Sequence, residues 1–172
     1  MSQYETVFGA IDDFKTGGVI AIDDDPKNYV FSNVYEVAAK SAPWERVAVG
    51  KNFEYVIEAM RAEGTSAWYS CAHDEFALNM DDREVTVELL KLDDPDSLVD
   101  QESEGGHKLA GEPAGRKMGW VKLRRGHMAL LPVGSAYRFV AEAPACVLIQ
   151  TIQGPETIER WADICQSVPM SA

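Results

Sequence analysis

His73 and Glu75 are the first pair in this sequence whose residue types and spacing could do chemistry. In a strand they would share one face, where an imidazole nitrogen and a carboxylate can bind the same metal ion. A metal site needs three or four converging ligands, and His127 would join the pair only if the register of its strand slipped. The competing interpretation is a hydrogen-bonded histidine beside a structural carboxylate.

The charge of the chain excludes one class of partner. The 172 residues carry a formal net charge of -12, which repels phosphate backbones, and basic residues cluster only in the short stretch 122–125. No apolar run approaches the ~20 residues that cross a bilayer, and residues 1–8 lack the pattern of a signal peptide. We therefore expect a soluble, cytoplasmic protein that binds neither nucleic acid nor membrane.

The three cysteines predict neither a disulfide framework nor a thiolate metal site. Cys71, Cys146 and Cys165 are odd in number, widely spaced and without a C-x-x-C pair. We expect reduced, buried thiols.

The first third of the chain predicts mixed elements. Residues 33–40 have helical spacing of apolar side chains, with Asn33 as the N-cap, and Pro43 follows the helix. Residues 53–62 fit either a helix or a strand, and the pattern leaves the two open.

From Gly64 onward the sequence predicts an antiparallel sheet. Residues 76–89 read as a hairpin around a turn at 81–83, and residues 93–119 as a long surface loop. A turn is expected at Ala143-Pro144, and a C-terminal helix over residues 155–167, with Pro155 as its first residue. The remaining predicted strands are 120–123, 128–131, 136–140 and 145–152.

These elements predict one domain in three parts. Residues 1–63 would form lead-in strands and helices packed on a barrel, residues 64–154 the barrel core, and residues 155–172 a C-terminal helix and tail.

Four residues near the end of the barrel region reproduce the spacing of a known motif. Gly126, Pro132, Gly134 and Tyr137 resemble the second cupin motif, in which the last position is normally a metal-binding histidine. Glycine and proline at these positions suit the turns on either side of a buried strand. The resemblance implies a mainly β fold, a cupin-type double-stranded β-helix (jelly-roll) barrel, with short N-terminal and C-terminal helices.

The first cupin motif resembles residues 64–82, with Glu75 at the position of the motif's glutamate. The two histidines that precede this glutamate in metal-binding cupins would fall within residues 68–71, where this sequence has no histidine. With Tyr137 at the other histidine position, we expect no metal site made by this chain alone.

Residues 33–37, 49–56, 68–69 and 73–77 together resemble the small (alpha) subunit of two-component hydroquinone 1,2-dioxygenases, and the likeness extends over residues 29–161. The resemblance implies an α2β2 heterotetramer with a larger cupin subunit. That larger subunit would hold Fe(II), and the enzyme would convert hydroquinone and O2 to 4-hydroxymuconic semialdehyde. This chain would then supply no catalytic group and no metal ligand.

In such an enzyme this chain can contribute to the wall of the substrate pocket. Trp68 is the first candidate, because its ring can stack on an aromatic substrate and its indole N–H can bind a phenolic oxygen. Tyr69, His73 and Tyr137 are further candidates, as hydrogen-bonding groups for the substrate or for the ligands of the partner's iron. A purely structural role for Trp68, in the barrel or at a subunit interface, is the alternative.

Two other functions fit the same residues. The chain could be a stand-alone cupin that binds a small aromatic ligand inside its barrel without catalysis. It could also be a single-chain metallo-cupin that uses His73, Glu75 and His127. Purification distinguishes the three functions by the partner chain, the oligomeric state and the metal content.

Overall fold

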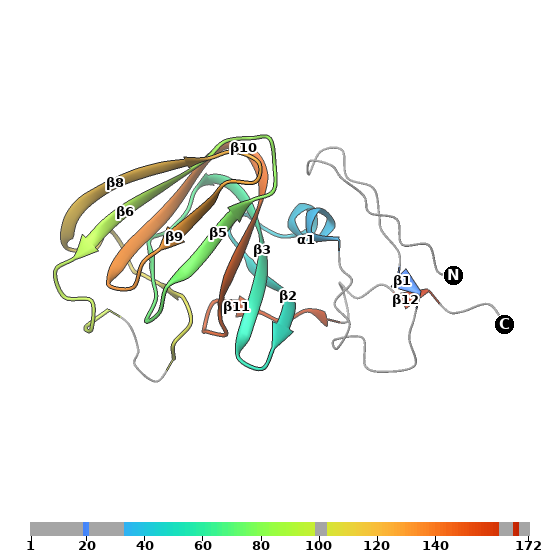
Figure 1. Ribbon diagram of the computed structural model, residues 1–172, viewed down its shortest axis with the longest axis horizontal. Coiled ribbons are helices and arrows are strands. Elements are labelled where there is room, and N and C mark those ends of the chain that lie inside the picture. Colours follow the sequence, from blue (N-terminus) through green and yellow to red (C-terminus); the bar gives the residue numbers. More distant parts are fainter. Residues whose placement is uncertain (1–18, 21–32, 99–102, 162–166, 169–172) are drawn as a thin grey trace.

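The computed structural model describes residues 19–20, 33–98, 103–161 and 167–168. Within these residues most of the chain is strand, and the strands curl around one another (Figure 1). Ten strands join into one sheet, and β1 (Val19–Ile20) pairs separately with β12 (Ser167–Val168). Among the described residues, no helix is long and apolar enough to span a membrane.

Helix α1 (Val34–Lys40) begins where the sequence predicts. The side chain of Asn33 accepts hydrogen bonds from the backbone N–H groups of Tyr35, at 3.0 Å, and of Glu36, at 3.4 Å, and so caps the first turn. The helix buries Val37 and Ala38 against the barrel, and Figure 1 shows it at one end of the strands. The predicted N-terminal helix and its cap are confirmed.

The barrel strands follow in the order of the chain. They are β2 (Arg46–Asn52), β3 (Tyr55–Thr65), β4 (Tyr69–Ser70), β5 (Glu75–Asn79), β6 (Val85–Leu92), β7 (His107–Lys108), β8 (Gly115–Leu123), β9 (Met128–Leu131), β10 (Ser135–Ile152) and β11 (Thr157–Ile158). The segment 53–62, which fits a helix or a strand by its pattern, is therefore mostly strand. Strand β3 pairs with both β2 and β10, which fixes it in the sheet.

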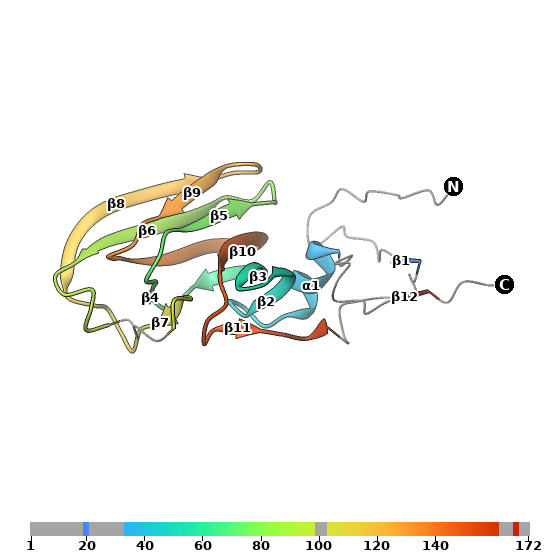
Figure 2. The ribbon, with the colours of Figure 1, turned by 60° about the horizontal axis from the view of Figure 1, so that its bottom comes forward.

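The long strand β10 connects the two halves of the barrel. Its first half pairs with β4 and β6, and its second half pairs with β3 and β5 (Figure 2). The register shifts between Ala141 and Ala145, so the turn predicted at Ala143-Pro144 is instead an irregularity within one strand. Proline fits there because the ladder requires no N–H at an unpaired position.

The predicted hairpin over residues 76–89 is wrong in its pairing, although both strands exist. Strand β5 pairs with β9 and β10, whereas β6 pairs with β8 and β10. Between them the side chain of Asn79 donates to the carbonyl oxygens of Arg83 and Leu123, and Asp81 accepts from the N–H of Arg83. These bonds make a corner that carries the chain from one half of the barrel to the other.

The C-terminal helix does not begin at Pro155 as predicted. Thr157 and Ile158 form β11, which runs parallel to β2. Both residues are β-branched and favour a strand, and the Thr157 hydroxyl accepts from the N–H of Gly154 at 3.0 Å. Trp161 is helical, Ser167 lies in β12, and the rest of the predicted helix, 162–166, lies outside the described residues.

The core lies inside the barrel, where alternate residues of the strands meet. The largest of its fully buried apolar side chains are Phe139, Met60, Leu123, Leu131 and Ile149. The aromatic ring of Tyr137 belongs to the same cluster, so a polar hydroxyl reaches deep into the barrel.

Candidate functional site

A buried arginine lies inside the barrel among acidic and tyrosine side chains. Arg46, at the start of β2, is 2% exposed, and Glu58 and Glu75 are each 0% exposed. Its Nε donates to Glu58 Oε2 at 2.5 Å, and its Nη2 donates to Glu75 Oε1 at 2.7 Å. Thr157 completes the cluster by donating to the other Glu58 oxygen at 2.6 Å. We call this set the Arg46 network.

Two tyrosines extend the Arg46 network. The Tyr137 hydroxyl donates to Glu75 and accepts from Arg46 Nη1 at 3.1 Å. The ring of Tyr69 stacks on that of Tyr137, with centroids 5.9 Å apart, and lies 5.8 Å from Arg46 Cζ. Both predicted tyrosines therefore face the interior and contact the same guanidinium.

Burial and electrostatic interactions fix the protonation of Arg46 and Tyr137 in this network. Burial by itself lowers the pKa of Arg46, but the electrostatic interactions with Tyr137, Glu75 and Glu58 outweigh it and raise that pKa well above the ordinary value. Burial, with the neighbouring Glu75 charge, raises the pKa of the Tyr137 hydroxyl well above its ordinary value. The arginine is thus a permanent cation, and the tyrosine stays protonated as a donor.

The long loop closes this end of the barrel. Strand β7, within the loop, pairs with β4, and Gly106 lies directly against the guanidinium of Arg46. A Cβ atom at Gly106 would stand only 2.3 Å from Arg46 Nη1, so no larger residue fits without displacing the arginine or the loop. The predicted loop over 93–119 is in fact partly strand, because β8 begins at Gly115.

The residues at the cupin ligand positions do not fit a metal ion. Glu75 and Tyr137 stand at two of these positions, and both bind the guanidinium of Arg46. A metal ion there would place a second cation against a permanent one. Among the described residues, no group of three or more His, Cys, Asp or Glu side chains could hold a metal ion.

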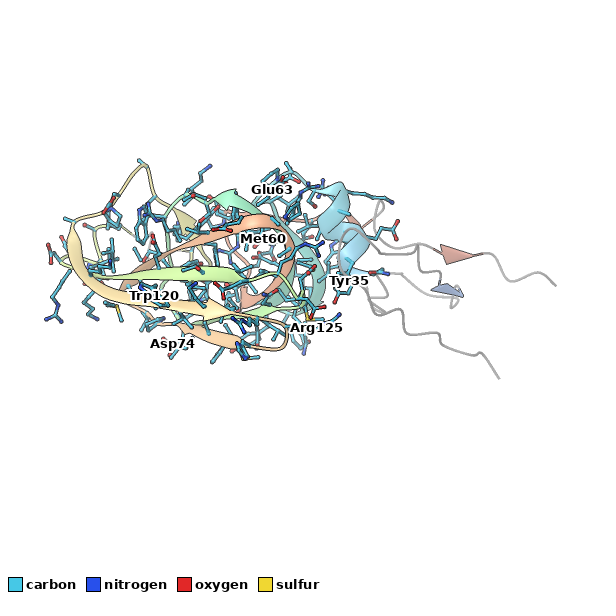
Figure 3. All side chains as sticks on the ribbon, turned by 90° about the horizontal axis from the view of Figure 1, so that it is seen from above. Tyr35, Met60, Glu63, Asp74, Trp120 and Arg125 are labelled. Carbon is cyan, nitrogen blue, oxygen red and sulfur yellow. The ribbon has the colours of Figure 1, made fainter. Side chains whose placement is uncertain are left out.

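Trp68 lies on the opposite face of the sheet from the two tyrosines. It packs with Leu90, Leu92 and Ala136, under Leu109 of the long loop. The guanidinium of Arg138 stacks over its ring, with Cζ 4.7 Å from the centroid. Trp120 on β8 is opposite Glu88, which is opposite Arg138, and Figure 3 shows Trp120 well apart from Arg125. We call Trp68, Glu88, Trp120 and Arg138 the outer-face cluster.

The indole N–H of Trp68 has no partner. The residue is 7% exposed, and its Nε1 is buried and makes no hydrogen bond. A buried donor without an acceptor is costly, by roughly 1–3 kcal/mol, unless a ligand or another chain supplies the acceptor. Trp44 is the other tryptophan among the described residues with such a nitrogen, and its ring stacks on Phe139.

His73 lies apart from both groups. Its Nδ1 is 2.8 Å from the carbonyl oxygen of Glu104 and 3.0 Å from the sulfur of Cys71, while Nε2 accepts from the N–H of Ile152 at 3.2 Å. The pKa of the Cys71 thiol is raised to about 12, by burial first and then by the charge of Glu75. The thiol is therefore protonated and unreactive.

The four predicted site residues consequently fall into three places. Tyr69 and Tyr137 meet inside the barrel, Trp68 lies in the outer-face cluster, and His73 ties the long loop to the end of β10. His127 is exposed in the turn before β9, where its Nδ1 accepts from the N–H of Arg124. The structure therefore does not bring His127 to the contacts of His73 and Glu75.

Sequence reasoning missed Arg46, Glu58 and Arg138. Arg46 and Glu58 are charged residues within β-prone, largely apolar stretches, and a charge at an inward position of such a stretch requires a buried counter-charge. That pattern is visible in the sequence, but the pairing of β2 with β3 is needed to connect the two residues.

Comparisons with solved structures identify relatives over nearly the whole chain. Hydroquinone 1,2-dioxygenase from Sphingomonas sp. TTNP3, with 4-hydroxybenzoate bound, is 63% identical over 96% of this chain and 99% of that chain, with a TM-score of 0.87. Hydroquinone 1,2-dioxygenase PnpCD, in complex with Cd2+ and 4-hydroxybenzonitrile, is 50% identical over 95% and 97%, with a TM-score of 0.84. No family model matches the chain, and no curated protein matches it.

A second kind of chain in the same enzymes shares only the fold. In PnpCD complexed with Fe3+, this chain covers 40% of a longer chain at 9% identity, with a TM-score of 0.59. In a structure of the Sphingomonas enzyme with 4-nitrophenol, this chain likewise covers 40% of a longer chain, at 12% identity and with a TM-score of 0.56. The fold is the expected cupin-type β barrel. Because two relatives match this chain end to end at 50% identity or more, it belongs to the hydroquinone 1,2-dioxygenases, which are oxidoreductases.

Proposed function

We propose that this chain is the small subunit of a hydroquinone 1,2-dioxygenase and works with a larger cupin subunit. PnpCD structures contain a chain that this one covers to 97% and another that it covers to only 40%. Two chain lengths in one enzyme support a two-component assembly, which we propose is an α2β2 heterotetramer. The reaction would open the ring of hydroquinone with O2 to give 4-hydroxymuconic semialdehyde.

We assign the iron to the larger subunit. The relatives are complexes with Cd2+ and Fe3+, so the enzyme class holds a metal. In this chain Glu75 and Tyr137, at two cupin ligand positions, bind the Arg46 guanidinium instead of a metal ion. This observation supports the proposal that a partner subunit binds Fe(II). The bound iron would supply the activation of O2, and this chain would supply no ligand to it.

The observation that carries the role of this chain is the unpartnered N–H of Trp68. The relatives bind 4-hydroxybenzoate and 4-hydroxybenzonitrile, which are aromatic rings with a phenolic oxygen. We propose that Trp68 lines the shared pocket, donates its N–H to such an oxygen and excludes water from one side of the ring. Tyr69 and Tyr137 would act indirectly, by holding the barrel interior, and His73 by fixing the loop end.

A ligand inside this barrel has less support than one at the outer face. The core side chains and the Arg46 network are buried in the interior, and the loop residue Gly106 packs onto the guanidinium. A stand-alone binding function would require an interior that is free for a ligand.

The test is to co-express the chain with its larger partner and to change Trp68→Phe, which keeps an aromatic ring and removes the N–H. The KM for hydroquinone should rise about fivefold, the loss expected for one hydrogen bond. Trp44→Phe is the matched control, because Trp44 also carries a buried, unpartnered N–H, and its KM should stay within about twofold. An assembled Trp68→Phe enzyme with unchanged KM would rule out the substrate contact. Iron that purifies with this chain when it is expressed alone would rule out the assignment of the metal to the larger subunit.

A further inference from the structure

The ring of Trp68 is covered on one face by a cation. Arg138 Cζ lies 4.7 Å from the centre of the indole ring, within the range of a cation–π contact. An indole N–H lies in the plane of the ring, at its edge, so a group stacked on the face does not occupy the direction in which the N–H points. The stacking therefore holds the plane of the indole ring, and with it the direction in which the Trp68 N–H can donate a hydrogen bond.

The guanidinium is itself held in place by a carboxylate. Arg138 on β10 is directly opposite Glu88 on β6, and its Nε donates to Glu88 Oε2 at 2.5 Å. The two side chains are about one-third exposed, at 31% and 33%, so the pair is partly open to solvent beside the buried Trp68. A charged hydrogen bond of this kind orients a planar guanidinium more strictly than solvent does.

The neighbouring strand extends the same arrangement outward. Glu88 is opposite Trp120 on β8, and Trp120 is 57% exposed. Lys122 Nζ lies 5.8 Å from the centre of the Trp120 ring. The outer-face cluster thus runs across β10, β6 and β8 as a charged pair, Arg138 and Glu88, between two tryptophans, and the unpartnered buried donor of Trp68 lies at its covered end.

We infer that Arg138 is a positioning residue for the ring-opening reaction, because it stacks on Trp68 and sets the direction in which the indole N–H meets the phenolic oxygen of the substrate. This inference rests on the proposed substrate contact of Trp68. The positive charge over the ring also draws electron density from the indole and makes its N–H a better donor. Glu88 supports Arg138 in the same task.

The experiment uses the assembled two-chain enzyme. Arg138→Met keeps the length of the side chain and removes both the charge and the planar group. We expect the KM for hydroquinone to rise about threefold to fivefold, with kcat within about twofold, because the lost contact is made equally to the bound substrate and the transition state. Arg138→Lys keeps a cation over the ring and should restore part of the loss.

A double change distinguishes positioning from general structural damage. In the Trp68→Phe enzyme no N–H remains to be directed, so adding Arg138→Met should raise KM no further. Arg125→Met is the matched control: it removes a surface arginine paired with Asp82 at 3.3 Å, at the end of β8 near Tyr35 (Figure 3), and should leave KM unchanged.

The outcomes distinguish the positioning role of Arg138 from the substrate contact of Trp68. If Trp68→Phe raises KM and Arg138→Met does not, the positioning role is refuted and the substrate contact stands. If neither variant changes KM, the contact itself fails. Additive effects of Trp68→Phe and Arg138→Met would also overturn the inference. Should Arg138→Met fail to assemble, Glu88→Gln carries the same test, with a smaller rise in KM expected and the same dependence on Trp68.

Discussion

Arg46 supplies the positive charge that two buried carboxylates require. Glu58 and Glu75 are fully buried, and each accepts a short hydrogen bond from the guanidinium. Arg46→Met should therefore lower the free energy of unfolding of the chain by about 3–5 kcal/mol, the usual cost of removing one partner from a buried ion pair. Urea unfolding followed by circular dichroism measures the change.

Two further variants test whether the lost charge causes the loss of stability in Arg46→Met. Lys51→Met removes an ion pair with Glu159, at 2.8 Å, in which both side chains are about one-third exposed, and it should lower the free energy of unfolding by less than about 1 kcal/mol. Adding Glu58→Gln and Glu75→Gln to Arg46→Met removes the unpaired charges and should recover stability relative to Arg46→Met alone. If the neutralised variant is no more stable, lost packing rather than lost charge explains the effect.

Cys146 gives the stability of the chain a dependence on alkaline pH. Burial, and then the charge of Asp81, raise the pKa of its thiol to about 12 from an ordinary value near 9. Above pH 9 the unfolded chain loses this proton and the folded chain keeps it, so stability that is complete below pH 9 is lost as pH rises toward 12. Between pH 8 and pH 10 the loss is about 1.4 kcal/mol.

The Cys146→Ala variant checks this prediction. Its free energy of unfolding should fall by about 1.4 kcal/mol less than that of the unchanged chain between pH 8 and pH 10. Cys71 is present in both proteins and so contributes equally to each measurement. Equal pH dependence of the two chains would contradict the prediction.

The residues of the candidate site were predictable to different degrees. Glu75 and Tyr137 follow from motif spacing, and Trp68 from its donor group. The contacts of Arg46 did not follow, because its partners lie 12 and 29 residues away and meet it only when the strands pair. Neither did the split between Trp68 and Tyr69, because adjacent strand residues point to opposite faces and the inward face depends on the register.

At the scale of elements, three strands, β3, β5 and β9, present apolar side chains to solvent, and β10 lies between β3 and β5. Ile57 on β3 is opposite Gln150 on β10, Gln150 is opposite Phe76 on β5, and Phe76 is opposite Leu130 on β9. Ile57, Phe76 and Leu130 are 45%, 39% and 47% exposed, and Met128 on β9 is 59% exposed. Exposed apolar side chains grouped in this way favour association.

Expressed without the larger partner that we propose, the chain is expected to self-associate through these strands. Leu130→Lys places a charge in the middle of the row and should shift the chain toward monomer in analytical ultracentrifugation. Val121→Lys, at a 40% exposed position on β8, is the matched control and should leave self-association unchanged. A monomeric unchanged chain at micromolar concentration would refute the expectation.

The elements themselves show where sequence patterns suffice. Helix α1 was predictable because its cap and apolar face are local. The pairing of β5 and β6 was not, because a three-residue turn suits a hairpin and a corner equally, and the choice depends on the distant strand β10. The helix at Pro155 failed for a similar reason: Thr157 and Ile158 gain a parallel partner in β2, more than 100 residues earlier.

At the scale of the whole molecule, the cupin barrel was predictable from the spacing of two motifs, and the family from a likeness over most of the chain. The part of the chain before Gly64 also contributes to the barrel, since β2 and β3 extend its sheet toward β11. The formal net charge of -12 is spread over a chain whose interior still contains a paired cation. The net negative charge of the chain therefore does not determine the charge of the buried Arg46 side chain.

The guanidinium of Arg46 inside the barrel is part of the polypeptide. A metal ion in that place could dissociate, exchange with a competing ion or be removed by a chelator, whereas Arg46 is delivered during synthesis at one per chain. Maturation of a small subunit of this kind, as we propose it, would consequently not wait for iron. In the two-chain enzyme that we propose, iron starvation would leave the small subunit complete and the large subunit unloaded.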